Sequence, residues 1–309
     1  MRIVSLVPTV TDLLVGYGLV EKLCGISREC HVGSRLETIT VVGTTVDCSV
    51  SEGQEIDRFQ RGILRAGVGI AELLAINPTI IFTTIEGEDP AVFIPWAENF
   101  LESRYGLSLR IRHVKVERLT DLYETIELVG KNAGFGTEAR STVSKMQTQI
   151  MQWGHLFFDR CKGKKCIALT GVDPICVAPP WVTDIVELLG AKPLQNQDGK
   201  TLSGKIAWEE LTNARPDVLI LLPKQKSLAE AVQVLPTLEA LPGWDQMPAV
   251  MRGEVGFCEG SVFDFSRSFL KGVAILVSIV AGLDSGSITP RDSFYKLRYV
   301  ELHRHRFLW

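Results

Sequence analysis

The sequence lacks the features of a membrane-spanning or nucleic-acid-binding protein. Its most apolar stretch, residues 269–283, is about 15 residues long and contains Lys271, whereas a helix that crosses a bilayer needs about 20. The 33 Lys and Arg residues nearly balance the 36 Asp and Glu residues, so the basic footprint that nucleic acid requires is missing. We therefore exclude nucleic acid as a partner and predict that residues 269–283 form a buried helix.

Paired cysteines and an export signal are also missing. The seven cysteines are an odd number without a CxxC pair, which favours reduced thiols over a disulfide framework. The first twenty residues contain one basic side chain, Arg2, and Pro8 and Asp12 interrupt their apolar run. This is not the pattern of a signal peptide. The sequence as it stands predicts a cytoplasmic protein, and a periplasmic or cell-surface one if a signal peptide has been removed.

Catalytic motifs are scarce. The sequence has no GxSxG elbow, no P-loop and no HExxH motif, and its five histidines have no zinc-site spacing. The neighbours Cys30 and His31 could coordinate a metal, but a structural or solvent-exposed role is favoured. We therefore expect a binding protein and not an enzyme, without a metal or a resident cofactor.

Short β-branched runs alternate with stretches of helical period from the first residue onward. The strands that this pattern predicts are residues 3–7, 22–26, 79–84, 110–116, 165–170, 218–222 and 255–258. The helices that it predicts are residues 11–17, 55–66, 71–76, 93–104, 119–132, 181–189, 207–213 and 266–282. Such alternation is typical of α/β folds with parallel sheets.

One predicted helix is unusually long. Apolar residues recur at spacings of three and four from Ala139 to Phe157 without an intervening proline, which predicts a continuous helix over residues 137–157. The helix lies midway between two sets of strands and helices, so we interpret it as a rigid connection between two lobes. Packing within a single domain is the alternative.

The two halves of the chain contain similar segments. Residues 8–14 (PTVTDLL) and 180–186 (PWVTDIV) match at an offset of 172, and Gly18 matches Gly190 at the same offset. Residues 77–82 and 215–220 share a proline before a buried strand. We therefore predict an N-terminal lobe at residues 1–134, a connecting helix at 135–160, a C-terminal lobe at 161–283 and a tail at 284–309. Two such lobes would leave a cleft at the carboxyl ends of their strands.

Two segments are candidates for ligand contact. Trp181 stands where a helix of the second lobe begins. Its side chain could present a flat face to a ring-shaped ligand, or it could pack in the core. Residues 261–267 combine aromatic and polar groups between a strand and the last helix. Their alternative role is a capped helix start with Ser266 as the N-cap.

Several motifs follow one another in an order that resembles a known family. They are RIVSLVP at residues 2–8 with Thr11 and Asp12, then residues 25–30, 55–58, 181–188, 208–218 and 241–255. The sequence resembles substrate-binding proteins of ABC importers of the iron-complex and cobalamin type, especially their cobalamin-binding branch. The resemblance implies a class III periplasmic-binding-protein-like fold, in which a long rigid helix joins two Rossmann-like lobes with parallel sheets. It also implies a ligand such as cobalamin, heme or a ferric siderophore.

The resemblance implies specific ligand-facing positions. They are Pro8, Thr9, Thr11, Glu29, Cys30, Thr44, Thr45, Ile85, Glu86, Trp181, Ser261, Phe263, Asp264 and Phe265. The sequence departs from the branch at residues 85–90, where a cysteine-bearing segment is usual, and at 224–226, where KQK replaces Cys-Gly-Phe. Residues 264–269 also replace a longer stretch. An anionic ligand paired with Lys224, Lys226 or Arg267 is therefore an alternative.

Importer-bound members of the family present one glutamate on each lobe to the membrane subunit. The resemblance implies Glu209 for the second lobe, but the equivalent count in the first lobe gives Ala71, with Glu72 beside it. We predict a binding protein for a large corrinoid or other tetrapyrrole, with an importer membrane subunit as a second partner. A siderophore-binding protein and a cytoplasmic enzyme or adaptor on the same scaffold are the alternatives.

Overall fold

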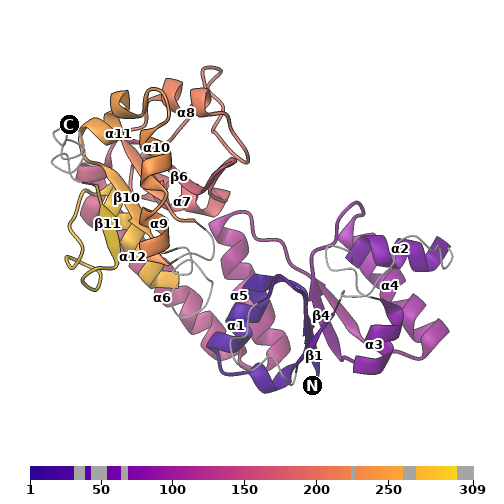
Figure 1. The fold of residues 1–309 in the computed structure, drawn as a ribbon. Helices are drawn as coiled ribbons and strands as arrows, with labels where there is room; N and C mark the ends of the chain where they lie inside the picture. The colour runs from indigo at the N-terminus through magenta and orange to yellow at the C-terminus, as the bar shows by residue number, and fades with distance from the viewer. Residues whose placement is uncertain (31–38, 43–53, 64–68, 224–226, 260–268, 298–309) are drawn as a thin grey trace. The chain divides into compact units, whose positions relative to one another are not determined.

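The computed structural model contains two compact units (Figure 1), and it describes residues 1–30, 39–42, 54–63, 69–223, 227–259 and 269–297. Unit 1 consists of the described residues of Met1–Val116 and Tyr123–Arg140. Unit 2 consists of Glu117–Leu122 and every described residue from 141 onward. The chain therefore enters unit 2 twice. It does so first over the six residues 117–122 and again at Ser141, within a long helix.

Unit 1 is built on a parallel sheet. Its strands are β1 (Ile3–Ser5), β2 (Leu23–Ile26), β3 (Thr40–Val41), β4 (Ile80–Thr83) and β5 (Arg110–His113), in the order β3-β2-β1-β4-β5. Its helices are α1 (Pro8–Gly16), the 3-10 turn η1 (Val20–Lys22), α2 (Gln54–Ile63), α3 (Ile70–Ile76), α4 (Pro90–Tyr105) and most of α5 (Leu119–Ala133). Helices α1 and α5 cover one face of the sheet, and α2, α3 and α4 cover the other (Figure 1).

The core of unit 1 lies between its sheet and helices α2, α3 and α4. Phe59, Leu73, Ile81 and Phe93 are each fully buried in one apolar cluster there. Gly62 lets α2 approach α4 closely, because a Cβ at this position would lie 2.2 Å from the ring of Phe93. This close approach shows that the core of unit 1 is tightly packed.

Unit 2 is built on a mixed sheet. Its strands are β6 (Lys165–Val172), β7 (Ile175–Val177), β9 (Val218–Leu221), β10 (Val255–Cys258) and β11 (Phe294–Lys296), in the order β11-β10-β9-β6-β7, and β8 (Lys192–Pro193) pairs with β6. Its helices are α7 (Pro180–Leu188), α8 (Trp208–Ala214), α9 (Leu228–Val232), α10 (Leu235–Glu239), η3 (Trp244–Gln246), α11 (Pro248–Met251) and α12 (Phe269–Val280). Strands β7 and β11 are antiparallel to their neighbours, while β6, β8, β9 and β10 pair in parallel.

Helix α12 confirms the predicted buried helix. Each described residue of this apolar helix is buried except Leu270 and Lys271. A Cβ on Gly256 of β10 would lie 2.7 Å from Ile279, so the helix packs directly on the sheet. No helix within the described part of the chain is long and apolar enough to cross a membrane.

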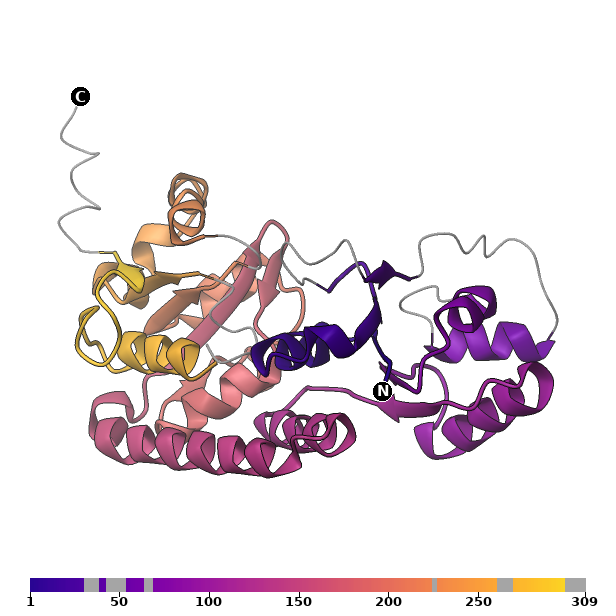
Figure 2. The same cartoon turned by 90° about the horizontal axis from the view of Figure 1, so that it is seen from below.

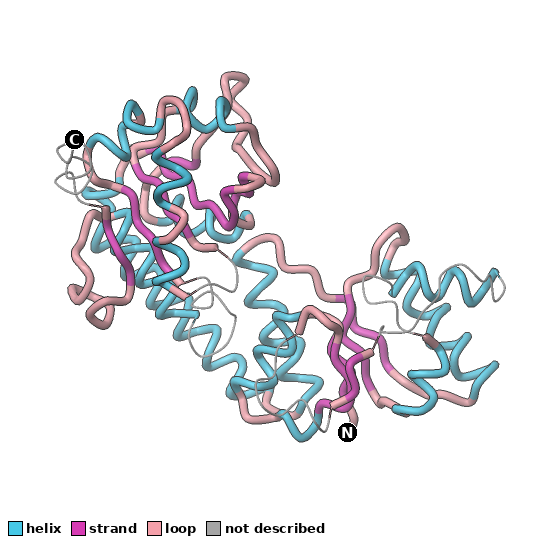
Figure 3. Tube along the Cα trace, viewed as in Figure 1, coloured by secondary structure: helices cyan, strands magenta, loops and turns pink. Residues whose placement is uncertain are grey.

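The long helix is α6 (Gly136–Cys161), which extends the predicted helix at both ends. Its predicted apolar stripe is buried at Ala139, Val143, Met146 and Ile150. The part of α6 in unit 2 packs against α7, because a Cβ on Gly154 would lie 2.8 Å from the carbonyl oxygen of Leu188. Figures 2 and 3 show the uninterrupted course of this helix.

The α/β class and its parallel strand pairs confirm the prediction from alternation. All seven predicted strands are present, with ends that differ by up to three residues. The prediction missed β3, β7, β8, β11 and helices α9 to α11. These elements have two to five residues, too few to show a period. Part of the predicted tail is strand β11, which pairs with β10 through Tyr295 and Phe257.

Candidate functional site

The candidate site of unit 1 lies where its parallel strands end. The carboxyl ends of β1, β2, β4 and β5 meet at one edge of the sheet because every strand pair is parallel. β1 and β4 are neighbours in the sheet but not in sequence. Ligands of doubly wound sheets bind outside such a switch point. We name residues 6–9, 27–30, 84–89 and 114–116, which follow these strands, the carboxyl edge of unit 1.

Hydroxyl groups close the turn between β1 and α1. The Thr11 hydroxyl donates a 2.8 Å hydrogen bond to Ser5 Oγ, and the Ser5 hydroxyl donates to the carbonyl oxygen of Val7 at 3.1 Å. Both side chains are completely buried. Thr11 therefore stabilises the turn, which brings the half-buried Pro8 and Thr9 to the start of α1. The ligand contact that the resemblance implies for Thr11 stays a prediction.

Cys30 belongs to the same buried group. Its sulfur lies 3.2 Å from Ser27 Oγ and donates a weak hydrogen bond to the carbonyl oxygen of Ser5 at 3.6 Å. Burial raises the pKa of the Cys30 thiol, so the thiol is protonated at neutral pH and is a poor metal ligand in this state. This geometry favours the structural role considered for Cys30. Glu29 beside it is exposed.

The loop between β4 and α4, residues 84–89, is tied to the end of β5. The Thr84 hydroxyl donates to the carbonyl oxygen of Val114 at 2.8 Å, and the Ile85 N–H donates to Nδ1 of His113 at 3.0 Å. Ile85 is 5% exposed and belongs to the core of unit 1, whereas Glu86 is exposed. The structure thus separates the two predicted ligand residues of this loop: Ile85 anchors it and Glu86 lies at its surface.

Sequence reasoning missed the role of His113. Because Nδ1 accepts the Ile85 hydrogen bond, the neutral ring carries its proton on Nε2. Burial lowers the pKa of His113, and the charge of Lys115 lowers it further. The signal in the sequence was a histidine within the strand predicted at residues 110–116, but the prediction did not show that the strand ends at His113, where a ring nitrogen can reach the neighbouring loop.

The turn before α7 in unit 2, which is equivalent to the turn before α1 in unit 1, has apolar surroundings. Trp181 follows Pro180 at the start of α7 and is only 4% exposed. Its ring lies 5.6 Å from that of Phe269 in α12, measured between centroids. This packing favours the core role that the sequence left open, and stacking of Trp181 on a ligand stays a prediction. A small pocket beneath α7 is lined largely by apolar residues, among them Val182, Val186 and Leu194.

The two predicted docking glutamates have different surroundings. Glu72 Oε2 accepts a 3.1 Å hydrogen bond from the Gly69 N–H and so caps the start of α3. Its counterpart in unit 2 is Glu210, which caps α8 by accepting from the Ala207 N–H at 2.9 Å. Glu209 is exposed one residue earlier. The carboxylate of Glu72 thus has a structural role, and Ala71 occupies the position equivalent to Glu209.

The remaining predicted site residues lie outside the described residues. They are Thr44, Thr45, Ser261, Phe263, Asp264, Phe265 and Arg267, with Lys224 and Lys226 of the anionic-ligand alternative. Of the predicted residues that the structure describes, it brings Thr11 and Cys30 together around Ser5. No group of three or more His, Cys, Asp or Glu side chains in the described segments could hold a metal ion.

No family model matches the sequence, and no curated protein matches it. Solved structures do match the fold. A periplasmic heme-binding protein from Pseudomonas aeruginosa is 18% identical with a TM-score of 0.62, and the match covers 96% of this chain and 98% of that chain. A periplasmic binding protein from Veillonella parvula is 15% identical with a TM-score of 0.63, over 91% of both chains.

A periplasmic vitamin B12 binding protein of Vibrio cholerae is 14% identical with a TM-score of 0.58, and this match covers 90% of this chain and 96% of that chain. At these identities the matches establish the fold. The chain has the two-lobed α/β fold of class III periplasmic binding proteins, as the resemblance implied. These neighbours are described as binding proteins and not as enzymes.

Proposed function

We propose that the chain is a non-enzymatic substrate-binding protein for a large ring-shaped metal complex, a corrinoid or other tetrapyrrole such as cobalamin or heme. The observation that carries the proposal is the fold match over nearly the whole chain to proteins described as binding heme and vitamin B12. The carboxyl edge of unit 1 supports it, because Thr9, Glu29 and Glu86 offer polar groups there. A broad ring with an amide or carboxylate rim needs such groups around it.

Capture would require no chemistry. Shape and hydrogen bonding would supply the affinity, and the preformed turns of unit 1 would reduce the entropy lost on binding. The resemblance further supports a position for the ligand between the lobes, retention by slight closure and delivery to the membrane subunit of an ABC importer in the periplasm or at the cell surface. Within that proposal the exposed Glu209 of α8 contacts the importer.

A second candidate ligand is a ferric siderophore or another anionic metal complex. It is favoured by the match to a possible iron-binding protein from Staphylococcus epidermidis, which is 17% identical with a TM-score of 0.58 over 90% of this chain. The two candidate functions rest on the same fold of the protein and differ only in the ligand that it binds.

A titration of the purified chain distinguishes the two candidate ligands. Hemin, cyanocobalamin and a ferric hydroxamate siderophore are each added, and binding is followed by visible absorbance and calorimetry. We expect one molar equivalent of hemin or cyanocobalamin to bind with a dissociation constant on the order of 1 μM or lower, equivalent to about 8 kcal/mol. Tight siderophore binding alone would select the second candidate. If none of the three bound above the level of the urea-unfolded chain, the proposed function would be wrong.

Two exposed glutamates on either side of β2 provide a matched pair of variants. Glu29 follows β2 at the carboxyl edge, whereas Glu21 precedes it in η1. We expect Glu29→Ala to change the affinity for the bound ligand and Glu21→Ala to leave it unchanged. The opposite result would place the ligand at the amino ends of the strands.

A further inference from the structure

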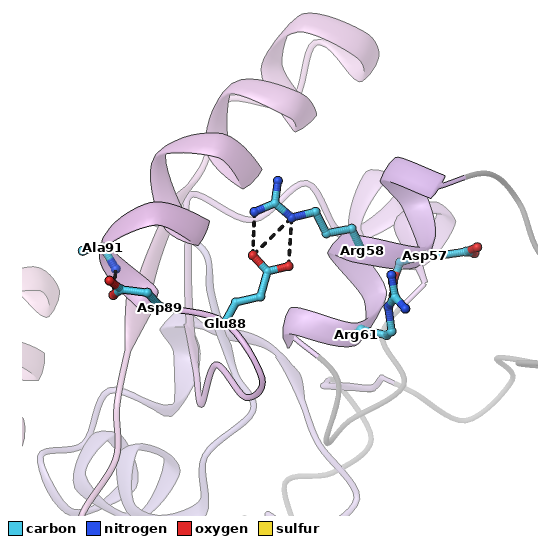
Figure 4. Close-up of polar contacts among 6 residues, drawn as sticks. All are labelled: Asp57, Arg58, Arg61, Glu88, Asp89 and Ala91. Carbon is cyan, nitrogen blue, oxygen red and sulfur yellow. Dashed lines mark hydrogen bonds and ion pairs between the residues drawn. The ribbon is translucent and has the colours of Figure 1, made fainter.

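An ion pair joins helix α2 to the loop between β4 and α4 (Figure 4). Arg58 Nε lies 2.8 Å from Glu88 Oε1, and its Nη2 lies 2.5 Å from Glu88 Oε2. This is the bidentate geometry in which a guanidinium fixes both the position and the orientation of a carboxylate. The Arg58 guanidinium also lies over the ring of Trp96 in α4, 4.1 Å from its centroid, which restricts Arg58 itself.

The loop is held at both ends and presents the residues in between. His113 and Val114 hold Thr84 and Ile85, as described above. At the other end Glu88 is held by Arg58, and Asp89 caps α4 by accepting a 2.9 Å hydrogen bond from the Ala91 N–H. Between these anchors, Gly87 has a φ of +76° with no atom near its Cβ position. Glu86 and Gly87 therefore form a short tip that fixed ends hold in place.

A stabilising role alone does not account for this pair. The side chains of Arg58 and Glu88 are 33% and 28% exposed, and pairs that water reaches contribute little to folding stability. A second pair, Arg104 of α4 with Glu55 of α2, already joins these two helices directly at 3.1 Å. The bidentate pair of Arg58 with Glu88 differs from this second pair, because its carboxylate belongs to the loop and not to a helix.

The pair stays charged over the physiological range. The hydrogen bonds from Arg58, together with its charge, hold the pKa of the Glu88 carboxyl below its usual value. The carboxylate is thus ionised above about pH 4.5 in either the folded or the unfolded chain. Loss of the pair by protonation is confined to more acidic solutions, so the loop keeps its conformation at neutral pH.

We propose that Arg58 and Glu88 are positioning residues of the ligand site, which hold the loop between β4 and α4 so that Glu86 and Gly87 meet the ligand in one conformation. The inference rests on the proposed function for its ligand, but the positioning of the loop is independent of any ligand. Affinity then depends on the pair because the binding loop is ordered before the ligand arrives.

Glu88→Ala tests the inference, with Glu55→Ala as the matched control in the ion pair that joins α2 to α4. Amide hydrogen exchange is measured for residues 85–88 in the chain without ligand, and affinity by the titration described above. We expect Glu88→Ala to speed exchange at these amides about tenfold and to weaken binding by about threefold to tenfold. Glu55→Ala should change neither. Arg58→Lys, which keeps the charge but loses the bidentate contact, should behave as Glu88→Ala does.

The two readouts separate the possible failures. Unchanged exchange in Glu88→Ala would overturn the positioning role whatever the ligand is. Faster exchange with unchanged affinity would overturn the link between the loop and binding. If the wild-type chain bound none of the ligands while Glu88→Ala still freed the loop, the proposed function would fail and the positioning role would stand.

Discussion

The two units build the same strand-to-helix turn from different surroundings. Helices α1 and α7 both have nine residues, begin with proline and are followed by a glycine of positive φ, 73° at Gly18 and 80° at Gly190. Each glycine N–H donates a hydrogen bond to the carbonyl oxygen three residues earlier: Gly18 to Val15 at 3.0 Å, and Gly190 to Glu187 at 2.9 Å. The shared residues start and stop the helix. The residue after the proline differs: Thr9 is half-buried, and Trp181 is packed in the core.

A second pair of helices extends the comparison. α3 and α8 have seven residues each, carry a capping glutamate at their third position and end in a left-handed residue, Asn77 with a φ of 49° and Arg215 with a φ of 52°. Each is followed by a proline and a buried strand. The local rules of helix ends are thus repeated between the units.

The interiors near the turns differ in polarity. Four of the five buried polar residues described in unit 1 lie close to the carboxyl ends of its strands: Ser5 and Thr83 end β1 and β4, Ser27 follows β2, and Thr11 lies in the first turn of α1. Of the buried polar residues described in unit 2, Ser278 lies in α12 and Thr289 lies before β11. We infer that unit 1 holds its turns by hydrogen bonds and unit 2 by apolar packing.

The first prediction concerns the residue after the helix proline. Trp181→Ala should lower the free energy of unfolding by about 3–5 kcal/mol, because it leaves a cavity beside Phe269. Thr9→Ala at the equivalent position should cost less than about 0.5 kcal/mol. Urea unfolding measures both. Unchanged stability of Trp181→Ala with lost ligand affinity would show that the indole contacts ligand and not the core.

The second prediction concerns Asp184 of α7, which is equivalent to Asp12 of α1. Asp184 Oδ2 accepts a 2.7 Å hydrogen bond from the Leu119 N–H, and Oδ1 lies 2.5 Å from Arg118 without hydrogen-bond geometry. Asp184→Ala should lower the free energy of unfolding by about 2 kcal/mol. Glu187→Ala, an exposed position on the same helix, is the control. If the two substitutions lowered the free energy of unfolding equally, the stabilising role of the Asp184 hydrogen bond would be refuted.

The third prediction uses the two left-handed helix ends. A left-handed conformation costs arginine more than asparagine, whose short side chain tolerates it. Arg215→Gly should therefore raise the free energy of unfolding by up to about 1 kcal/mol, and Asn77→Gly by only a few tenths. Thermal or urea unfolding of the pair measures the difference. A larger gain for Asn77→Gly would contradict this account of the conformational cost.

The fourth and smallest prediction concerns the last residue of an equivalent strand, His113 in β5 and Cys258 in β10. The folded pKa of His113 is lowered by burial, so the stability that its neutral ring contributes is complete above about pH 6.5 and declines as the pH falls below it. Burial raises the pKa of Cys258 to about 12, outside that window.

The stability of wild type relative to His113→Asn should therefore fall between pH 6.5 and 5, because asparagine Oδ1 can accept the Ile85 hydrogen bond without titrating. The stability of wild type relative to Cys258→Ser should stay constant there. Urea unfolding at several pH values measures both differences. A pH-independent difference for His113→Asn would contradict the stabilising role of the hydrogen bond from the Ile85 N–H to the neutral His113 ring.

The sequence predicts the elements with a clear period and the turns with strong local signals. The apolar stripe of α6 and the repeated Pro-x-x-Thr-Asp start of α1 and α7 were sufficient to place those helices. Short elements such as β8 and β11 escaped prediction because their pairing is long-range and leaves no local pattern.

The site was predictable to a smaller extent. The turns that follow β1, β2 and β4 were identified, but the sequence does not distinguish a side chain that faces a ligand from one that faces its own core. Thr11, Cys30 and Ile85 proved buried, and the pair of Arg58 with Glu88 joins residues 30 positions apart. Such distinctions depend on tertiary contacts that neither composition nor spacing specifies.

Hydrogen exchange with and without bound hemin or cyanocobalamin shows whether the turns at the carboxyl ends of the unit 1 strands bind the ligand. We expect slower exchange at residues 6–9, 27–30 and 84–88 in the complex, with no change at residues 20–22 and 77–79, which precede β2 and β4. Protection confined to residues 20–22 and 77–79, or a complex without protection in either group, would contradict binding at these turns.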